Sequence, residues 1–168
     1  RICKRLYFDK DVRYYLDKDE ISVKEEQVET IQNLIHSEII RGSKIHSIYV
    51  YYQKQDTLIT EDEVVSADWF QNDTWLDYCN MEFGARMITP VWTVNESIDG
   101  KRVQKDVVSV IRCFPVYKTN NLGAVVVNVE IGDITDEMKY LDKTEQTTTL
   151  MLNNVGIVQM SGNGNYDK

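Results

Sequence analysis

The sequence predicts an α+β domain in which a long N-terminal helix packs on a central antiparallel sheet. Three observations lead to this prediction. Apolar residues recur at helical spacing between residues 23 and 41. Two runs dense in β-branched and aromatic residues, within Val107–Ile131, flank a short polar loop, which is typical of an antiparallel hairpin. A shorter run, Lys44–Lys54, alternates well enough for a further strand.

Length, composition and charge limit the kinds of protein that this chain can be. The 168 residues are enough for one domain, or one domain and part of another, and 42% of them are hydrophobic. The formal net charge of −8 argues against a nucleic-acid partner, because phosphate contacts need a basic surface. No run of about 18 apolar residues is present, so no transmembrane helix is expected within the chain. The N-terminus also lacks the apolar core of a signal peptide.

The N-terminal part is expected to be helical. Residues 1–20 are charged and carry weak helical anchors. The next helix is clearer and is predicted over Val23–Arg41, because Ser22 and Glu25 form a capping box and Gly42 supplies a stop. Its core positions are Val28, Ile31, Ile35 and Ile39.

A strand is predicted over Lys44–Lys54, with Thr57–Thr60 as its hairpin partner. Its alternation places Ile48, Val50 and Tyr52 on one face and Tyr49 and Tyr51 on the other.

A short helix capped by Ser66 or Asp68 is then expected to lie over the sheet, because its aromatic density is too high for a fully exposed helix. Residues Arg86–Val94 predict one more strand, in which Pro90 indicates an edge or a bulge. The polar stretch Asn95–Asp106 is predicted to be a loop.

The central hairpin has two unlike strands. In the second run the odd positions 125–131 are all apolar, whereas the even positions become polar at Asn128 and Glu130. Arg112 interrupts the first run, and a charge there needs a partner, a ligand or water. We therefore expect this sheet to line a pocket. A short helix capped by Asp133 and a second hairpin, Thr147–Met160, are expected to follow.

This order of elements resembles an extracytoplasmic Cache domain. Four pieces carry the resemblance: Ile45–Thr60, Asp68-Trp69-Phe70, Pro115-Val116-Tyr117 and Gly123–Ile131 before a helix. The resemblance covers roughly residues 20–142. It implies a long N-terminal helix on a PAS-like antiparallel sheet, with a ligand pocket on the opposite face.

The resemblance also implies a domain organisation and a cellular context. Residues 1–44 are the expected N-terminal helical segment, residues 45–134 the membrane-distal module, and residues 135–168 a connecting helix and part of a membrane-proximal module. Such a chain is the extracellular small-molecule sensor of a bacterial transmembrane signalling protein. The implied output is a sensor histidine kinase of a two-component system or an AraC-type regulator, most like those of Gram-positive bacteria. Flanking segments outside this chain would tether it to the membrane.

The same resemblance bears on the ligand. Amino-acid-binding members carry an Arg two residues before a Trp-Tyr pair and an Asp in the strand after the central Gly. Here Ala67, Trp69-Phe70 and Asn128 occupy those positions. Ala67 cannot pair with a carboxylate, and Asn128 has no charge to offer an ammonium group. We therefore expect free α-amino acids not to bind in that mode, and the ligand itself stays unidentified.

Eight residues are candidates for ligand contact because each offers an aromatic ring, a polar group or both. Each has a structural alternative: a buried Asn is usually satisfied within the protein, an Arg is as readily ion-paired, and a Trp is more often core. The candidates are Tyr49, Tyr51, Trp69, Arg86, Trp92, Arg112, Tyr117 and Asn128.

No motif supports catalysis, a metal site or a cofactor. The chain has no nucleophile elbow, P-loop or dinucleotide fingerprint, and its three cysteines lack zinc or redox spacing. We expect no enzyme activity of this domain. Two other hypotheses stay open: a ligand-free spacer or dimerisation module using the Val23–Arg41 helix, and a cytoplasmic PAS-like domain holding haem or flavin, with His36 or His46 as axial ligand.

Overall fold

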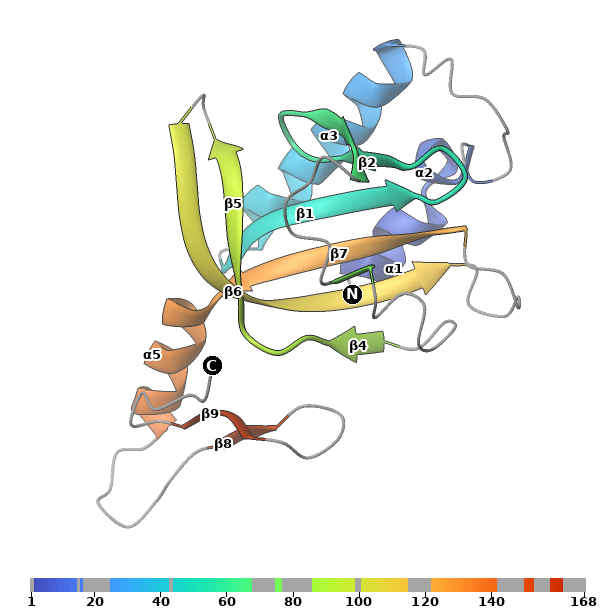
Figure 1. Ribbon diagram of the computed structural model, residues 1–168. Helices are drawn as coiled ribbons and strands as arrows, with labels where there is room; N and C mark the ends of the chain where they lie inside the picture. Colours follow the sequence, from blue (N-terminus) through green and yellow to red (C-terminus); the bar gives the residue numbers. More distant parts are fainter. Residues whose placement is uncertain are drawn as a thin grey trace.

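Seven antiparallel strands form one sheet, with β7 at its centre (Figure 1). The computed structural model describes residues 2–14, 16, 25–42, 44–67, 75–76, 86–98, 101–114, 122–141, 150–152 and 158–161. The strands run in the order β3-β2-β1-β7-β6-β4, and β5 also pairs with β6. Their bounds are β1 Ile45–Tyr52, β2 Thr57–Ile59, β3 Val64–Ser66, β4 Arg86–Ile88, β5 Trp92–Ile98, β6 Lys101–Phe114 and β7 Gly123–Glu130.

The prediction that the hairpin within Val107–Ile131 is central to the sheet is confirmed. β7 pairs with β1 along one edge and with β6 along the other. Its residues from Gly123 to Asn128 are all buried, which explains why this strand is almost continuously apolar. Successive side chains of β7 point to opposite faces of the sheet. Val125 lies opposite Val50 and Arg112, whereas the next residue, Val126, lies opposite Tyr49 and Ile111.

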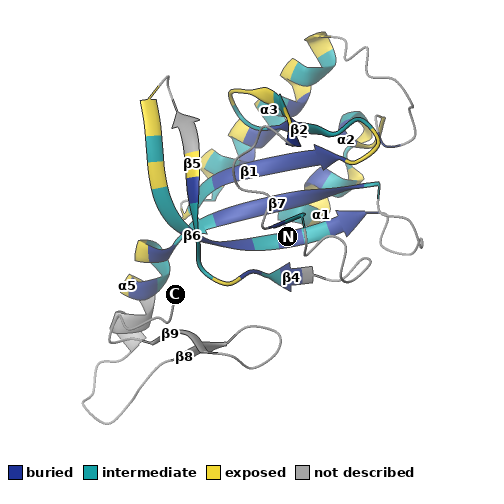
Figure 2. Ribbon diagram, in the orientation of Figure 1, coloured by how far each residue is buried: buried dark blue, intermediate teal, exposed yellow. Residues whose placement is uncertain are grey.

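Three helices cover the face of the sheet that carries Val125 (Figures 1 and 2). They are α1 Ile2–Phe8, α2 Lys10–Tyr14 and α3 Glu25–Arg41. Ile31 and Ile35 of α3 are fully buried against the sheet, as their spacing predicts. The hydroxyl group of Tyr52 in β1 donates a hydrogen bond of 2.9 Å to the carbonyl of Val12, so this helical layer is also fixed by a buried polar contact.

Polar contacts join the N-terminal helices to one another. Asp9 separates α1 from α2 and caps α2, because its side-chain oxygen accepts the Asp11 N–H at 2.9 Å. Glu38 of α3 is only 1% exposed, and its carboxylate lies 2.9 Å from Arg5 of α1 and 3.5 Å from Arg41. A carboxylate buried this deeply needs such partners, and the pair with Arg5 therefore links α1 to α3.

Two predictions for the middle of the chain are wrong. Arg86–Val94 is not one strand, because β4 ends before Pro90 and β5 begins after it. Asn95–Asp106 is not a loop, since most of it belongs to the hairpin of β5 and β6, which rises away from the rest of the sheet in Figure 1. Several positions along this projecting hairpin are exposed, so its sequence lacks the apolar alternation of a half-buried strand.

The C-terminal elements follow the predicted order. Helix α5, Ile131–Leu141, begins two residues before Asp133, and its Ile131 and Ile134 pack near Val108 of β6. Strands β8 Leu150–Leu152 and β9 Val158–Ser161 form a separate hairpin, which confirms the second hairpin signal. Among the helices that the structure describes, none combines the length and apolarity needed to cross a membrane.

Gly123 is required by the close approach of β7 to its neighbours. A Cβ at this position would lie 2.1 Å from the backbone oxygen of Tyr51 and 2.8 Å from the Phe114 ring. Backbone cannot move aside as a flexible side chain can. By contrast, a Cβ at Gly132 in the first turn of α5 would meet no heavy atom closer than 4.0 Å.

Gly123→Ala should therefore lower the free energy of unfolding by about 3 kcal/mol, at the upper end of the cost of overpacking. Gly132→Ala is the matched control and should leave it unchanged or raise it by up to about 1 kcal/mol, because alanine favours the helix. Urea denaturation measures both. Equal midpoints for the two variants would contradict the close contact at Gly123.

Candidate functional site

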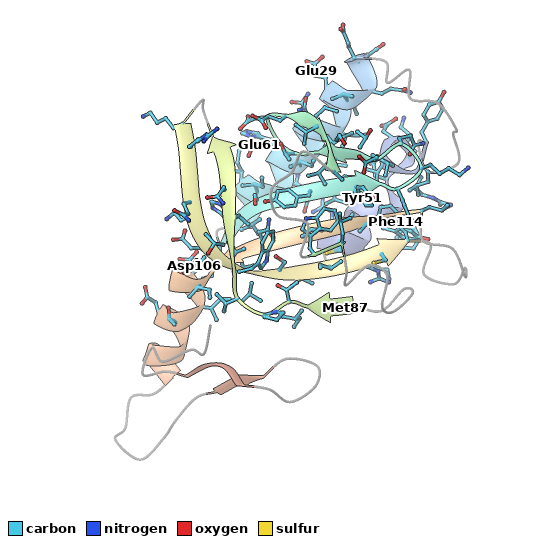
Figure 3. All side chains as sticks on the ribbon, in the orientation of Figure 1. Glu29, Tyr51, Glu61, Met87, Asp106 and Phe114 are labelled. Atoms are coloured by element: carbon cyan, nitrogen blue, oxygen red, sulfur yellow. The ribbon has the colours of Figure 1, made fainter. Side chains whose placement is uncertain are left out.

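A second core lies on the face of the sheet turned away from α1, α2 and α3. It is built from the alternate residues of β1, β6 and β7, so its members are the sequence neighbours of those in the first core. Its members are aromatic, aliphatic or sulfur-containing side chains, and the only buried charged side chain among the described residues, Glu38, lies in α3 instead. Tyr51 and Met87 of this core are labelled in Figure 3. The buried members are Tyr49, Tyr51, Leu58, Ala67, Trp75, Met87, Ile111, Cys113, Ala124 and Val126.

Three buried polar side chains cross the sheet next to this core. Ser47 of β1 and Ser109 of β6 lie directly opposite Asn128 of β7. The Ser109 hydroxyl donates to Asn128 Oδ1 at 2.6 Å, and Asn128 Nδ2 donates to Ser47 Oγ at 2.9 Å. We call Ser47, Asn128 and Ser109 the polar ladder. Because Asn128 is fully buried, these two bonds offset much of the cost of placing an amide there.

The ladder continues into the hairpin of β5 and β6. The indole N–H of Trp92 donates to Ser109 Oγ at 2.7 Å. The backbone N–H of Ser109 donates to Thr89 Oγ1 at 2.9 Å, and its carbonyl accepts the Thr89 N–H at 2.9 Å. Thr89 precedes Pro90, so these bonds to Ser109 hold the chain to β6 where β4 gives way to β5. The segment between β4 and β5 is therefore held in place beside the polar ladder.

One buried polar atom on this face has no hydrogen-bond partner among the described residues. Trp75 lies in a helical turn, is 1% exposed, and its ring meets Tyr51 edge-on with centroids 5.3 Å apart. Its indole Nε1 is buried and makes no hydrogen bond with the described residues. A buried donor in this state costs about 1–3 kcal/mol, so it is the one energetically unfavourable feature that we find in the described part of this core.

Four of the eight candidate residues come together here. Tyr49 and Tyr51 point into the second core and are 0% and 7% exposed. Trp92 packs against the same core, and Asn128 lies beside it in the polar ladder. The alternation that placed Tyr49 and Tyr51 on a face separate from Tyr52 is confirmed.

Of the other four candidates, only Arg112 has a side chain that the structure describes, and it lies elsewhere. Arg112 shares the helical face with Val125, its register partner, and its Nε is buried without a hydrogen-bond acceptor in the described part of the chain. Arg86 pairs with Arg112 in register, but its side chain lies outside what the structure describes, as do Trp69 and Tyr117 entirely.

Sequence inspection missed three residues of this site. Ser47 and Ser109 matter only through their alignment with Asn128, and register between strands is not visible in one sequence. The alternation in β1 does place Ser47 on the face of Tyr49, so part of the signal was present. Trp75 was expected as core, and nothing in the sequence shows that its N–H lacks an acceptor.

The described residues show no metal-binding group: no three His, Cys, Asp or Glu side chains gather at one place. His36, on the exposed side of α3, contacts the Glu61 carboxylate instead. The described side chains of the second core and the polar ladder offer hydrogen bonding by neutral groups and stacking on aromatic rings.

Comparison with known proteins identifies the fold. No family model matches the chain, and no curated protein is significantly similar in sequence. Solved structures are similar: the sensory domain of the Campylobacter jejuni chemoreceptor Tlp3 with isoleucine bound has a TM-score of 0.57 at 12% identity, over 99% of this chain and 65% of that one. The chain has a Cache-like fold.

Two further solved structures have a similar fold. The periplasmic sensory domain of C. jejuni Tlp1 has a TM-score of 0.53 at 14% identity, over 96% of this chain and 64% of its own. The extracellular domain of a histidine kinase candidate, vpHK1S-Z8, has a TM-score of 0.55 at 11% identity, over 80% and 50%. The chain thus spans about half to two thirds of the length of these Cache-like structures.

Asn128→Ala should lower the free energy of unfolding by about 2–3 kcal/mol, because it leaves the Ser109 hydroxyl without its acceptor in a buried site. Gln104→Ala, at an exposed position of β6, is the matched control and should change it by about 0.5 kcal/mol or less. Urea denaturation of both variants makes the comparison. If the two lose equally little, the ladder does not stabilise the sheet.

Proposed function

We propose that this chain is the membrane-distal, ligand-sensing part of a bacterial transmembrane receptor, and that a small molecule binds at the second core. The observation that carries the proposal is a buried core rich in aromatic side chains on the sheet face opposite the helices, in a Cache-like fold. Aromatic walls with a few fixed polar groups are the usual composition of small-molecule sites. On this proposal residues 45–134 form the sensing module, and residues 135–168 begin a membrane-proximal one.

The ligand class is expected to differ from that of the amino-acid sensors. Ala67 is buried in the second core and brings no charge to it. Asn128 is neutral, and its amide already bonds with both serines of the ladder. A zwitterion would thus find neither an arginine for its carboxylate nor an aspartate for its ammonium group at these two positions. A neutral ligand with an apolar body suits the described residues better.

Signalling would use the sheet itself. Tyr51 lies in the second core, whereas the next residue, Tyr52, packs under the helices and bonds to Val12 of α2. A ligand that displaces β1 therefore acts on both layers, provided that it binds one arrangement more tightly than the other. The proposed context is the extracellular side of the membrane, a histidine kinase or AraC-type output, and a homodimer formed through the long N-terminal helix, α3.

A ligand-free spacer module is the second candidate. It is favoured by the packing of the second core, in which Tyr49 and Trp75 are buried and the described bonds of Asn128 stay within the protein. The two candidates differ in one measurable respect. Only the sensor gains stability from a small molecule.

A thermal-shift screen against sugars, organic acids, amino acids and short peptides tests the proposal. A compound at 100 times its dissociation constant adds about 2.7 kcal/mol of stability. For a chain of this length that corresponds to a rise in melting temperature of about 5–10 °C. We expect at least one uncharged compound to produce it.

Isoleucine is the matched negative control, since it is bound in the Tlp3 structure and should give no shift here. A shift with isoleucine would contradict the ligand class. The absence of a shift with every compound, in a protein that forms dimers, would instead favour the spacer module.

A further inference from the structure

Trp75 and Trp92 provide two indole N–H groups on the same face of the sheet, and only one has an acceptor. The N–H of Trp92 is satisfied by Ser109. The N–H of Trp75 is enclosed without a hydrogen-bond partner in the described part of the chain, although its ring is well packed against Tyr51. An indole N–H is a donor only, so no rotation of the side chain turns it into an acceptor for a neighbouring group.

A buried donor without a hydrogen-bond partner needs an explanation, because most buried polar atoms in folded proteins are paired. Packing alone does not require a tryptophan here, since phenylalanine would offer an aromatic ring without the unsatisfied donor. The polar ladder shows that this fold does supply acceptors to buried donors on the same face, as it does for Trp92. The Trp75 N–H is therefore suited to an acceptor that comes from outside the described protein groups.

The surroundings of Trp75 restrict the chemistry of that acceptor. Among the described residues the only buried charged side chain is Glu38, in α3 on the other face of the sheet, and Arg112 also lies on that face. A carboxylate held by one N–H in such surroundings would be poorly compensated. A carbonyl, amide or hydroxyl oxygen accepts the same bond without a net charge.

We propose that Trp75 Nε1 donates a hydrogen bond to a neutral oxygen of the ligand, and that the ligand is an uncharged molecule with an apolar body and such an oxygen. The inference rests on the proposed sensing function and specifies the chemistry of that site. Because Nε1 has no exposed surface in the structure, the ligand reaches it only by displacing the atoms that cover it. Binding is in this way linked to a change in the second core.

Indole ¹⁵N–¹H spectra of the whole chain test the donor first. The three tryptophans give three cross-peaks, and the peak lost in Trp75→Phe identifies Trp75. An N–H without an acceptor should resonate upfield of the Trp92 N–H and move downfield when an uncharged hit from the thermal screen is added. Cross-relaxation to a bound water, with no movement on adding the hit, would overturn the proposal because the water is then the acceptor.

Affinity measurements on variants give the second test. Trp75→Phe keeps an aromatic ring and should weaken binding of the oxygen-bearing hit about tenfold more than it weakens binding of an analogue that lacks the oxygen. Trp92→Phe is the matched control and should weaken the two compounds by the same factor. Equal loss of both compounds in Trp75→Phe would overturn the inference alone. A screen in which no compound stabilises the wild-type protein would overturn the proposed function itself.

Discussion

The structure depends on the burial of β7 on both faces and along both edges. β1 and β6 satisfy its backbone, and the two cores cover its side chains. A strand in this position tolerates few substitutions. The neighbours of Gly123 leave no room for a Cβ, and Val125 and Val126 are fully buried on opposite faces of the sheet. The remaining elements are arranged around it, with helices on one face and the aromatic core on the other.

Asn128 is the polar exception within that strand, and its neighbours explain why it is tolerated. Serines at the two register positions beside it provide one donor and one acceptor, so the amide is bonded without any charge entering the sheet. A neutral network of this kind specifies register, because a shift of one residue would put the amide among apolar groups of the first core. The same network also keeps the face uncharged, and this limits the ligands that it can favour.

Sequence patterns predicted the parts of this fold whose burial is one-sided or complete. The period of α3, the two faces of β1 and the apolar β7 follow from helical and strand spacing. The hairpin of β5 and β6 was missed because it projects from the sheet and is held by polar pairs such as Lys105 with Glu130, 2.7 Å apart. Alternation placed Tyr49 and Tyr51 on one face, whereas the approach of Trp92 and Asn128, the ladder and the unpaired donor of Trp75 depend on contacts between strands and across the core.

The two cores are mechanically linked because they share strands. Along β1, β6 and β7 alternate residues belong to alternate cores, so no displacement of the sheet is confined to one side. On the helical side β1 is bonded to α2 through Tyr52, and α1 is tied to α3 by Arg5 and Glu38. Closely packed layers respond to a shift by moving between discrete arrangements and not by gradual deformation. A ligand that accepts the hydrogen bond of the Trp75 N–H would stabilise one such arrangement of the aromatic core. Because the strands are shared, the N-terminal helices would shift to the arrangement that goes with it.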